Sequence, residues 1–282
     1  MKKFLYKLKL LFLRVLCYEK PLRVAFTKYL SLKFPCFRPH YESLIYEASK
    51  NAIKLGFKEI NVIELGVAGG NGIRSILKYK RKIEKILDIK INIIGFDTGT
   101  GLPNSDLKED LPYFWKHGDY KNNNLKDLEK EGNHIKIYEG NISSTIDDYI
   151  IENKSKIGLI FFDLDLYSST KLFLDKIQEL SEKKLLLPRV FCYFDDLFIA
   201  DYTLNDINGE PLAIEEFNAK YKKIKLGKTF DHITDFKFPL AKGQIYTLHD
   251  FENEYYNKYI GIYSSDSLSI KNNENIRSLL DD

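Results

Sequence analysis

Two short segments each place a pair of aspartates directly after a run of apolar residues. "FFDLDLYSST" contains Asp163 and Asp165, and "YFDDLF" contains Asp195 and Asp196. Residues two apart on an extended strand face the same side, so the first segment points both of its carboxylates together. If the two strands are neighbours, four carboxylates crowd one edge of a sheet and repel one another. A divalent cation that prefers oxygen ligands, Mg²⁺ above all, would neutralise them.

Such an acidic site suits one kind of chemistry. An alcohol bound to a divalent cation loses its proton more easily, and a neighbouring carboxylate can accept that proton. The alternative is that the four aspartates cap the following helices and form surface ion pairs. Paired acids at two strand ends are more than capping requires, and this favours a metal site.

A glycine-rich segment, "IELGVAGGNG", follows an earlier apolar run. Gly66, Gly69 and Gly70 predict a tight turn at the start of a helix, where the backbone can approach a ligand closely. The spacing differs from the G-x-G-x-x-G pattern of dinucleotide-binding turns, and Glu64 suits a cationic cofactor better than a pyrophosphate. Asp97, at the end of the next apolar run, is placed to accept hydrogen bonds from a ribose. The glycines alone would fit tight packing, but the combination favours S-adenosylmethionine as cofactor.

Two further segments leave their roles open. Asn141 in "YEGN" follows a third apolar run, where it either contacts the adenine of the cofactor or caps a helix. The aromatic segment "YFWKHGDY" contains Tyr113, Phe114 and Trp115, which either contact an acceptor or cover the core. The contacts of each side chain decide between these alternatives.

The elements that position these residues alternate regularly along the chain. Short apolar runs predict strands over 59–65, 91–97, 134–140, 156–163 and 189–196. The segments between and after them predict helices over 71–87, 123–131, 143–154, 168–183 and 209–221. Two later segments, 222–230 and 242–251, predict an antiparallel strand pair. This alternation predicts an α/β fold with a doubly wound, mostly parallel Rossmann-like sheet and a late antiparallel pair.

Charge is distributed unevenly along the 282 residues. Residues 1–34 hold nine Lys and Arg against one acid, which leaves 34 basic and 39 acidic side chains in the remainder. A mildly acidic body argues against a nucleic-acid enzyme. We therefore divide the chain into a basic amphipathic extension over 1–40, a catalytic domain over 41–250 and a tail over 251–282. The extension is either a helix packed on the domain or on a sister subunit of a homo-oligomer, or a helix lying on an anionic membrane surface.

Cysteine usage bears on the compartment. Cys17, Cys36 and Cys192 are scattered without a metal-like or disulfide-like spacing, which is typical of reduced thiols in a cytoplasmic protein. Charges interrupt the apolar residues of the N-terminus, so it matches neither a signal peptide nor a transmembrane helix. We expect a cytoplasmic protein with a peripheral contact to the inner face of the membrane as the open alternative.

The chain resembles the macrocin-type O-methyltransferases, metal-dependent enzymes that methylate sugar hydroxyls. The resemblance covers about residues 41–250 and is carried by "FDLDLYSST", "FDDLF", "FDTGTGLP" and "GEPLAIEEFN". It implies a methyltransferase fold, S-adenosylmethionine and Mg²⁺ as cofactors, and a sugar-containing acceptor such as a glycoside or a surface-polysaccharide precursor. By position, the resemblance implies metal ligation by Asp163, Asp195 and Asp196, a general base at Asp165, and cofactor contacts from Glu64, Gly66 and Asp97.

The sequence departs from this family at Gly99, which stands where an aromatic residue is usual. Two other functions stay open at this point. One is an NAD-dependent nucleotide-sugar oxidoreductase or epimerase, which the glycine spacing opposes. The other is a non-catalytic scaffold with the same fold, which the presence of all four aspartates opposes.

Overall fold

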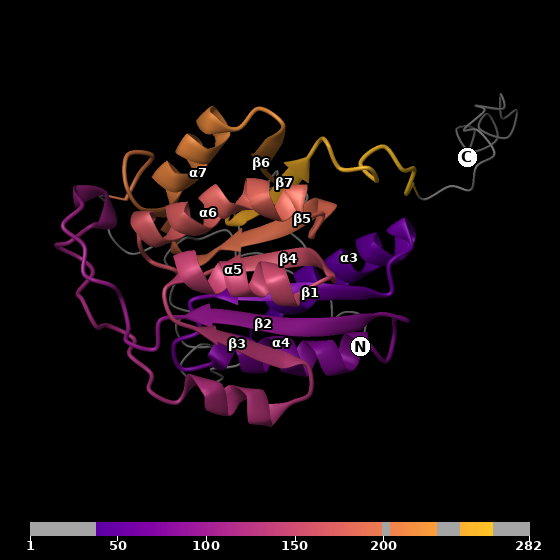
Figure 1. The fold of residues 1–282 in the computed structure, drawn as a ribbon, viewed down its shortest axis with the longest axis horizontal. Coiled ribbons are helices and arrows are strands. Elements are labelled where there is room, and N and C mark those ends of the chain that lie inside the picture. The colour runs from indigo at the N-terminus through magenta and orange to yellow at the C-terminus, as the bar shows by residue number, and fades with distance from the viewer. Residues whose placement is uncertain (1–37, 199–203, 230–242, 262–282) are drawn as a thin grey trace, which may run out of the picture.

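A computed structural model describes residues 38–198, 204–229 and 243–261 (Figure 1). The described residues form one seven-stranded sheet in the order β3-β2-β1-β4-β5-β7-β6. The strands are β1 (Glu59–Leu65), β2 (Lys90–Asp97), β3 (Ile135–Glu139), β4 (Lys156–Phe162), β5 (Leu186–Phe194), β6 (Ile224–Lys228) and β7 (Ile245–Asp250).

The first five strands run parallel, whereas β7 lies antiparallel to both β5 and β6. The predicted doubly wound, mostly parallel α/β sheet with a late antiparallel pair is therefore confirmed. Because β4 pairs with both β1 and β5, the carboxyl ends of these three strands lie side by side at one edge of the sheet. Ligands of open α/β sheets bind at this edge.

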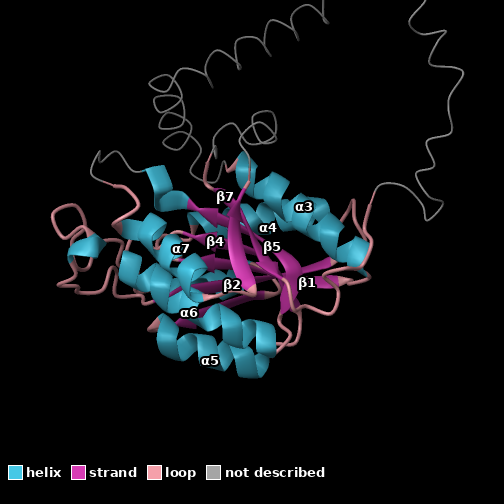
Figure 2. Cartoon of the chain, turned by 90° about the horizontal axis from the view of Figure 1, so that it is seen from above, coloured by secondary structure: helices cyan, strands magenta, loops and turns pink. Residues whose placement is uncertain are grey.

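Helices cover both faces of the sheet (Figure 2). One layer holds α3 and α4, which contact each other, and the opposite layer holds α5, α6 and α7, in which α6 contacts both neighbours. The α-helices are α3 (Pro39–Leu55), α4 (Asn71–Ile83), α5 (Ile142–Glu152), α6 (Tyr167–Glu182) and α7 (Gly209–Lys220). Three short 3₁₀ helices are η1 (Lys108–Asp110), η2 (Leu125–Glu131) and η3 (Asp195–Phe198).

The central strands lie between these two layers. In β1 and β4, every residue after the first is buried, as expected of parallel strands covered on both faces, and β1 buries the polar side chains of Asn61 and Glu64 as well. Aromatic rings join the strands to each other and to α3, since Phe162 stacks on Phe194 at 4.3 Å and Tyr41 stacks on Phe161 at 3.7 Å between centroids. The strands that carry the aspartates are therefore packed on both faces by apolar and aromatic side chains.

Several predicted boundaries differ from the structure. β5 begins at Leu186, ahead of the predicted 189, because Pro188 lies at a register irregularity between β4 and β5 where it disrupts no regular ladder. Residues 125–131 form the 3₁₀ helix η2 where an ordinary helix was predicted. The helix α3 was not predicted as an element, although Tyr41 and Leu44 are buried by it.

The predicted extension and tail are described only in part. Residues 1–34, with their predicted amphipathic helix and membrane contact, lie outside the described residues. In the predicted tail, Tyr255 packs its ring edge-on against Phe57 at 5.2 Å between centroids. Within the described ranges, no helix combines the length and the apolar character that crossing a bilayer requires.

Candidate active site

Three of the predicted aspartates meet at the carboxyl ends of β4 and β5. One carboxylate oxygen from each of Asp163, Asp195 and Asp196 lies within 4.8 Å of the other two. Asp163 follows β4 directly, and the other two open η3 at the end of β5. The convergence expected from neighbouring strands is therefore present in the structure.

Asp165 lies beside this group in an unusual backbone conformation. Its φ is 61°, in the left-handed region that costs a non-glycine residue of the order of 1 kcal/mol or more. Its backbone N–H donates to Asp196 Oδ2 at 3.0 Å, which offsets part of that cost. Burial raises the pKa of Asp165 to about 7; a hydrogen bond with Asp196 opposes the rise, and the charge of Asp195 adds to it.

Two carboxyl groups of the acidic group, those of Asp163 and Asp196, have raised pKa values, as expected when buried carboxylates lie close together. The pKa of Asp163 lies well above its ordinary value, because of burial first and the charge of Asp195 second. Burial also raises the pKa of Asp196, with the charge of Glu210 as the next cause. Each of these groups would hold its proton less tightly if a cation entered the site.

Glu210 is a buried acid beside this group that we did not predict. It lies in the first turn of α7, is fully buried, and accepts the backbone N–H of Asp196 through Oε2 at 3.2 Å. A signal was present in the sequence, because Glu210 is followed at helical spacing by Ala213, Ile214 and Phe217, which are all buried. That periodicity places a carboxylate on the apolar face of the helix, where it needs a polar partner.

Other contacts hold the turn that carries Asp195. The Tyr193 hydroxyl donates to Asp195 Oδ1 at 2.6 Å, and Gln244 Nε2, just before β7, donates to the Asp195 carbonyl at 2.6 Å. The late antiparallel pair thus helps to position the acidic group. Neither contact was predicted from the sequence.

The start of α3 brings a cation to the site. Arg38 Nη1 donates to the Tyr41 hydroxyl at 2.7 Å and lies 3.7 Å from Asp163 Oδ2. The Tyr41 hydroxyl in turn donates to Glu64 Oε1 at 3.3 Å. A chain of polar contacts therefore joins the aspartates at the end of β4 to Glu64 near the end of β1.

Glu64 is buried, and its second oxygen is unsatisfied. Oε2 finds no hydrogen-bond partner among the described residues. Burial raises the pKa of Glu64 to about 7, although the charge of Arg38 and the hydrogen bond from Tyr41 oppose the rise. A buried carboxylate with a free oxygen is suited to a cationic ligand.

The predicted glycine turn lies between Glu64 and the aspartates. Gly66 has a φ of 81°, and a Cβ built on it would lie 1.8 Å from the Asp163 carbonyl oxygen. Gly70, with a φ of 79°, directly precedes α4. Gly69 has open space around it, since no atom of the described chain would lie within 4 Å of a Cβ there. Glycine is thus required at Gly66 by close backbone packing, while Gly69 leaves room for a ligand.

Asp97 and Asn141 are engaged by the backbone. Asp97 Oδ2 accepts the N–H groups of Val67 and Ala68 at 2.8 Å each, and Oδ1 accepts the Gly99 N–H at 2.8 Å. Asn141 caps α5 through its side-chain oxygen, which accepts the Ser143 N–H at 2.9 Å. The helix-capping alternative for Asn141 is therefore observed, and the cofactor contacts of both residues stay predictions.

The segment after β2 crosses the glycine turn. Asn122 donates from Nδ2 to the Ala68 carbonyl at 2.6 Å and from its backbone N–H to Gly99 at 3.1 Å. A cavity of about 550 Å³ opens there, and its wall includes Ala68, Gly69 and Tyr120. Burial, followed by the charges of Asp165 and Asp196, raises the pKa of Tyr120 to about 12. Tyr120 therefore lines the cavity beside the glycine turn and is affected by the charge of the aspartates.

The aromatic segment that leads into Tyr120 remains largely open to solvent. Tyr113 is 63% exposed and Phe114 is 41% exposed, so these two side chains cover little of the core. Trp115 contacts Phe114 edge-on at 4.6 Å between centroids, and its Nε1 has no hydrogen-bond partner within the described ranges. The exposure of Tyr113 and Phe114 argues against the core-covering alternative for these two side chains, and contact with an acceptor stays a prediction.

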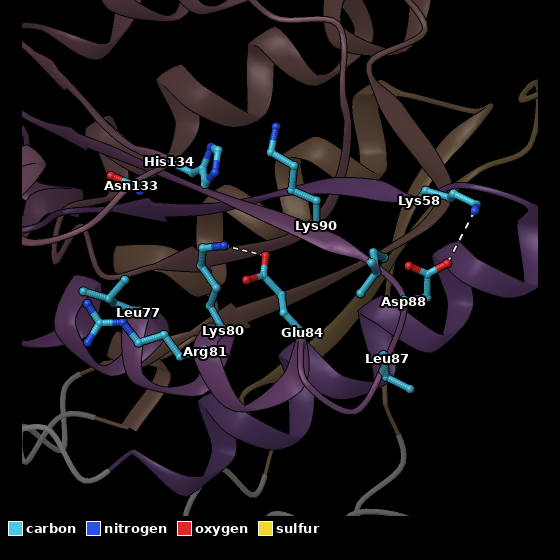
Figure 3. Close-up of a pocket in the computed structure, with 11 residues that line it drawn as sticks. Lys58, Leu77, Lys80, Arg81, Glu84, Leu87, Asp88, Lys90, Asn133 and His134 are labelled. Atoms are coloured by element: carbon cyan, nitrogen blue, oxygen red, sulfur yellow. Dashed lines mark hydrogen bonds and ion pairs between the residues drawn. The ribbon is translucent and has the colours of Figure 1, made fainter.

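A second cavity, of about 610 Å³, lies at the opposite edge of the sheet (Figure 3). Its wall includes Lys58 and Lys90, at the amino ends of β1 and β2. Figure 3 shows Lys80 directed at Glu84 and Lys58 directed at Asp88, and both pairs are ion pairs. Because its three lysines already have acidic partners and it lies at the amino ends of the strands, away from the aspartates, we do not assign the chemistry to this cavity.

Comparison with known proteins gives structural likenesses alone. No protein-family model matches the chain, and no curated protein matches it in sequence. The chain is similar to the calicheamicin methyltransferase CalS11, with 23% identity and a TM-score of 0.48, over 67% of this chain and 76% of CalS11. It is similar to the O-methyltransferase NovP, with 14% identity and a TM-score of 0.49, over 75% of this chain and 79% of NovP. An O-methyltransferase from Bacillus cereus, solved with SAH, shows 13% identity and a TM-score of 0.41 over 80% and 97% of the two chains. The seven-stranded sheet, with β7 inserted antiparallel between β5 and β6, has a doubly wound, Rossmann-like arrangement.

Proposed function

We propose that this protein is an S-adenosylmethionine-dependent O-methyltransferase that methylates a sugar hydroxyl with the help of a divalent cation. One observation carries the proposal. The glycine turn at Gly66 packs against the backbone of Asp163, so a donor held by the turn lies next to an acceptor held by the aspartates. Methyl transfer requires this juxtaposition, because donor and acceptor must be aligned within contact distance.

The residues around the glycine turn fit the proposed cofactor. S-adenosylmethionine supplies a methyl group already activated by its sulfonium and carries a second cation, its ammonium group. The free Oε2 of Glu64 offers a buried carboxylate to such a cation, and the open space at Gly69 admits a ligand to the backbone. Asp97 and Asn141 remain proposed contacts for the ribose and the adenine.

The aspartates fit a hard divalent cation such as Mg²⁺. Asp163, Asp195 and Asp196 present oxygen donors close enough to share one ion, and their crowding is relieved by positive charge. When bound, the cation would lower the pKa of an acceptor hydroxyl. The three aspartates would then orient that hydroxyl toward the donor side of the site.

Asp165 is the proposed general base. Its backbone N–H donates to Asp196 Oδ2, which places the residue beside the three aspartates and holds its left-handed backbone. Burial raises the pKa of Asp165 and so makes it a stronger base than an ordinary aspartate, and a bound cation would help to keep its carboxylate ionised. In this role its carboxylate takes the proton from the acceptor hydroxyl.

The surroundings of the aspartates support a sugar as acceptor. Exposed aromatic side chains at Tyr113, Phe114 and Tyr120 belong to the segment after β2, and Tyr120 lines the cavity at the glycine turn. Aromatic faces bind apolar ring surfaces while polar groups fix orientation, and sugars offer both an apolar face and hydroxyls.

Binding and activity measurements test the proposal together. Calorimetry with S-adenosylhomocysteine and with Mn²⁺ should give binding of both, and removal of metal with EDTA should abolish methyl transfer to a panel of sugars and nucleotide sugars. Asp195→Asn should lose Mn²⁺ affinity, whereas Asp148→Asn, an exposed acid on α5, serves as the matched control. Undiminished activity after exhaustive EDTA treatment would refute the metal role. Binding of NAD in place of S-adenosylhomocysteine would favour the dinucleotide enzyme instead.

A further inference from the structure

Glu210 makes a contact that the proposed reaction does not by itself explain. Its side chain is fully buried, at the start of a helix that is otherwise apolar on this face. An isolated carboxylate is costly to bury, so its position demands a partner. The partner it finds is the backbone N–H of Asp196, in the acidic turn η3.

Contacts on both oxygens fix Glu210 in place. Oε2 accepts the Asp196 N–H at 3.2 Å, and the Thr170 hydroxyl lies 3.5 Å from Oε1. Thr170 is itself fully buried on α6. Glu210 therefore ties α6 and α7 to the turn that carries two of the three converging aspartates.

The effect of this contact extends to the side chain of Asp196. With its N–H held by Glu210, Asp196 directs Oδ2 to the backbone N–H of Asp165 at 3.0 Å. That bond supports the left-handed conformation of Asp165. Through its contact with the Asp196 N–H, the carboxyl group of Glu210 thus orients Asp196, a proposed metal ligand, and through Asp196 it also orients Asp165, the proposed base.

We propose that Glu210 is a positioning residue of the acidic site: by accepting the Asp196 N–H it fixes the turn η3 so that Asp163, Asp195 and Asp196 converge on one cation. This inference rests on the proposed function, because it assumes that the three aspartates bind a metal. Glu210 does not belong to the group of oxygens that lie within 4.8 Å of one another, which separates its role from that of a ligand.

Two variants of similar size test the inference. Glu210→Gln keeps an oxygen that can accept the Asp196 N–H but removes the charge, whereas Glu210→Leu fills the space and removes the acceptor. Glu215→Leu, at an exposed position on the same helix, is the control. Mn²⁺ affinity is read from the loss of the free-ion signal in electron paramagnetic resonance, S-adenosylhomocysteine affinity from calorimetry, and folding from thermal unfolding.

We expect Glu210→Leu to weaken Mn²⁺ binding by about 10- to 100-fold, the range typical of residues that orient metal ligands. Glu210→Gln should stay within about threefold of the wild type, and S-adenosylhomocysteine affinity should be unchanged in both. If Glu210→Leu does not fold, Glu210→Ala replaces it in the comparison.

Two results would overturn the role of Glu210. Equal Mn²⁺ affinity in the wild type and in the variant without the acceptor would show that the contact is dispensable. An equal loss in Glu210→Gln and Glu210→Leu would show that the charge acts on the metal directly. Failure of the wild type to bind Mn²⁺ is a different outcome, since it refutes the metal role of the aspartates themselves.

Discussion

Replacing Glu64 by Gln is expected to stabilise the ligand-free protein at alkaline pH and to weaken its affinity for S-adenosylmethionine. Burial raises the pKa of Glu64 from its ordinary value of 4.5 to about 7. A carboxyl group with a raised folded-state pKa binds its proton more tightly in the folded chain than in the unfolded one. Its contribution to stability is therefore complete below pH 4.5 and is lost as the pH rises toward 7.

The size of the effect follows from the same two pKa values. Each tenfold difference in proton affinity corresponds to about 1.4 kcal/mol, so ionising Glu64 in the folded protein costs about 3 kcal/mol at pH 8. Gln has nearly the same shape, keeps an acceptor for the Tyr41 hydroxyl and never ionises. The Gln variant should thus match the wild type near pH 4 and exceed it in stability by about 3 kcal/mol at pH 8.

Urea denaturation at several pH values between 4 and 8 measures this difference, since the other acidic groups are common to both proteins and cancel. For cofactor affinity we expect the opposite ranking, with the wild type above the Gln variant, because a cation near Glu64 favours the ionised carboxylate. Loss of a charged partner should weaken S-adenosylmethionine binding by about 10- to 100-fold in calorimetry. If the free energy of unfolding depends on pH in the same way in both proteins, the pKa of Glu64 is not raised in the folded state. Unchanged cofactor affinity would remove it from the donor site.

Three further perturbations test other parts of the site. Asp163→Asn should abolish turnover and Mn²⁺ binding. The S-adenosylhomocysteine affinity of this variant, measured by calorimetry, should stay within about tenfold of the wild type, because the proposed metal contacts the acceptor and not the nucleoside. Retained turnover would contradict this. Gly66→Ala should destabilise the fold by about 2 kcal/mol or more in thermal unfolding, since its Cβ would lie 1.8 Å from a backbone oxygen and its φ is 81°. Gly69→Ala is the matched control, with space for a Cβ, and an equal loss in both would argue against the packing reason. Tyr120→Ala should raise the KM for the acceptor about tenfold with little change in cofactor affinity, and an effect on cofactor affinity alone would move Tyr120 to the donor side.

The sheet was predictable because its central strands are buried on both faces. Strand β1 shows as a short, mostly apolar run that Asn61 and Glu64 interrupt, and its predicted bounds, 59–65, agree with the structure. The alternation of such runs with helices leaves few topologies open, and neighbouring parallel strands bring their carboxyl ends to one edge. The meeting of Asp163 with Asp195 and Asp196 follows from that rule, without knowledge of any side-chain contact.

The remainder of the site depends on contacts that no local pattern encodes. Arg38 reaches Asp163 only because α3 packs across the sheet, and Gln244 reaches Asp195 only through the pairing of β7 with β5. Asp97 shows a different difficulty. A polar residue at a strand end can serve a ligand or the neighbouring backbone, and its position in the sequence is the same in both cases.

The three backbone N–H groups gathered by Asp97 have a consequence for how quickly a ligand is captured. Two of them, from Val67 and Ala68, hold the glycine turn to the end of β2 through bonds within the chain itself, so part of the entropy loss of ordering that turn belongs to folding. The proposed cofactor would therefore bind to a turn that is already ordered. Its association rate should be limited by diffusional encounter and orientation, with no slow ordering step of the turn. For the same reason, substitution of Asp97 should be poorly tolerated. It would remove the hydrogen bonds that order the glycine turn, and so it would disturb the binding surface whether or not a ligand is bound.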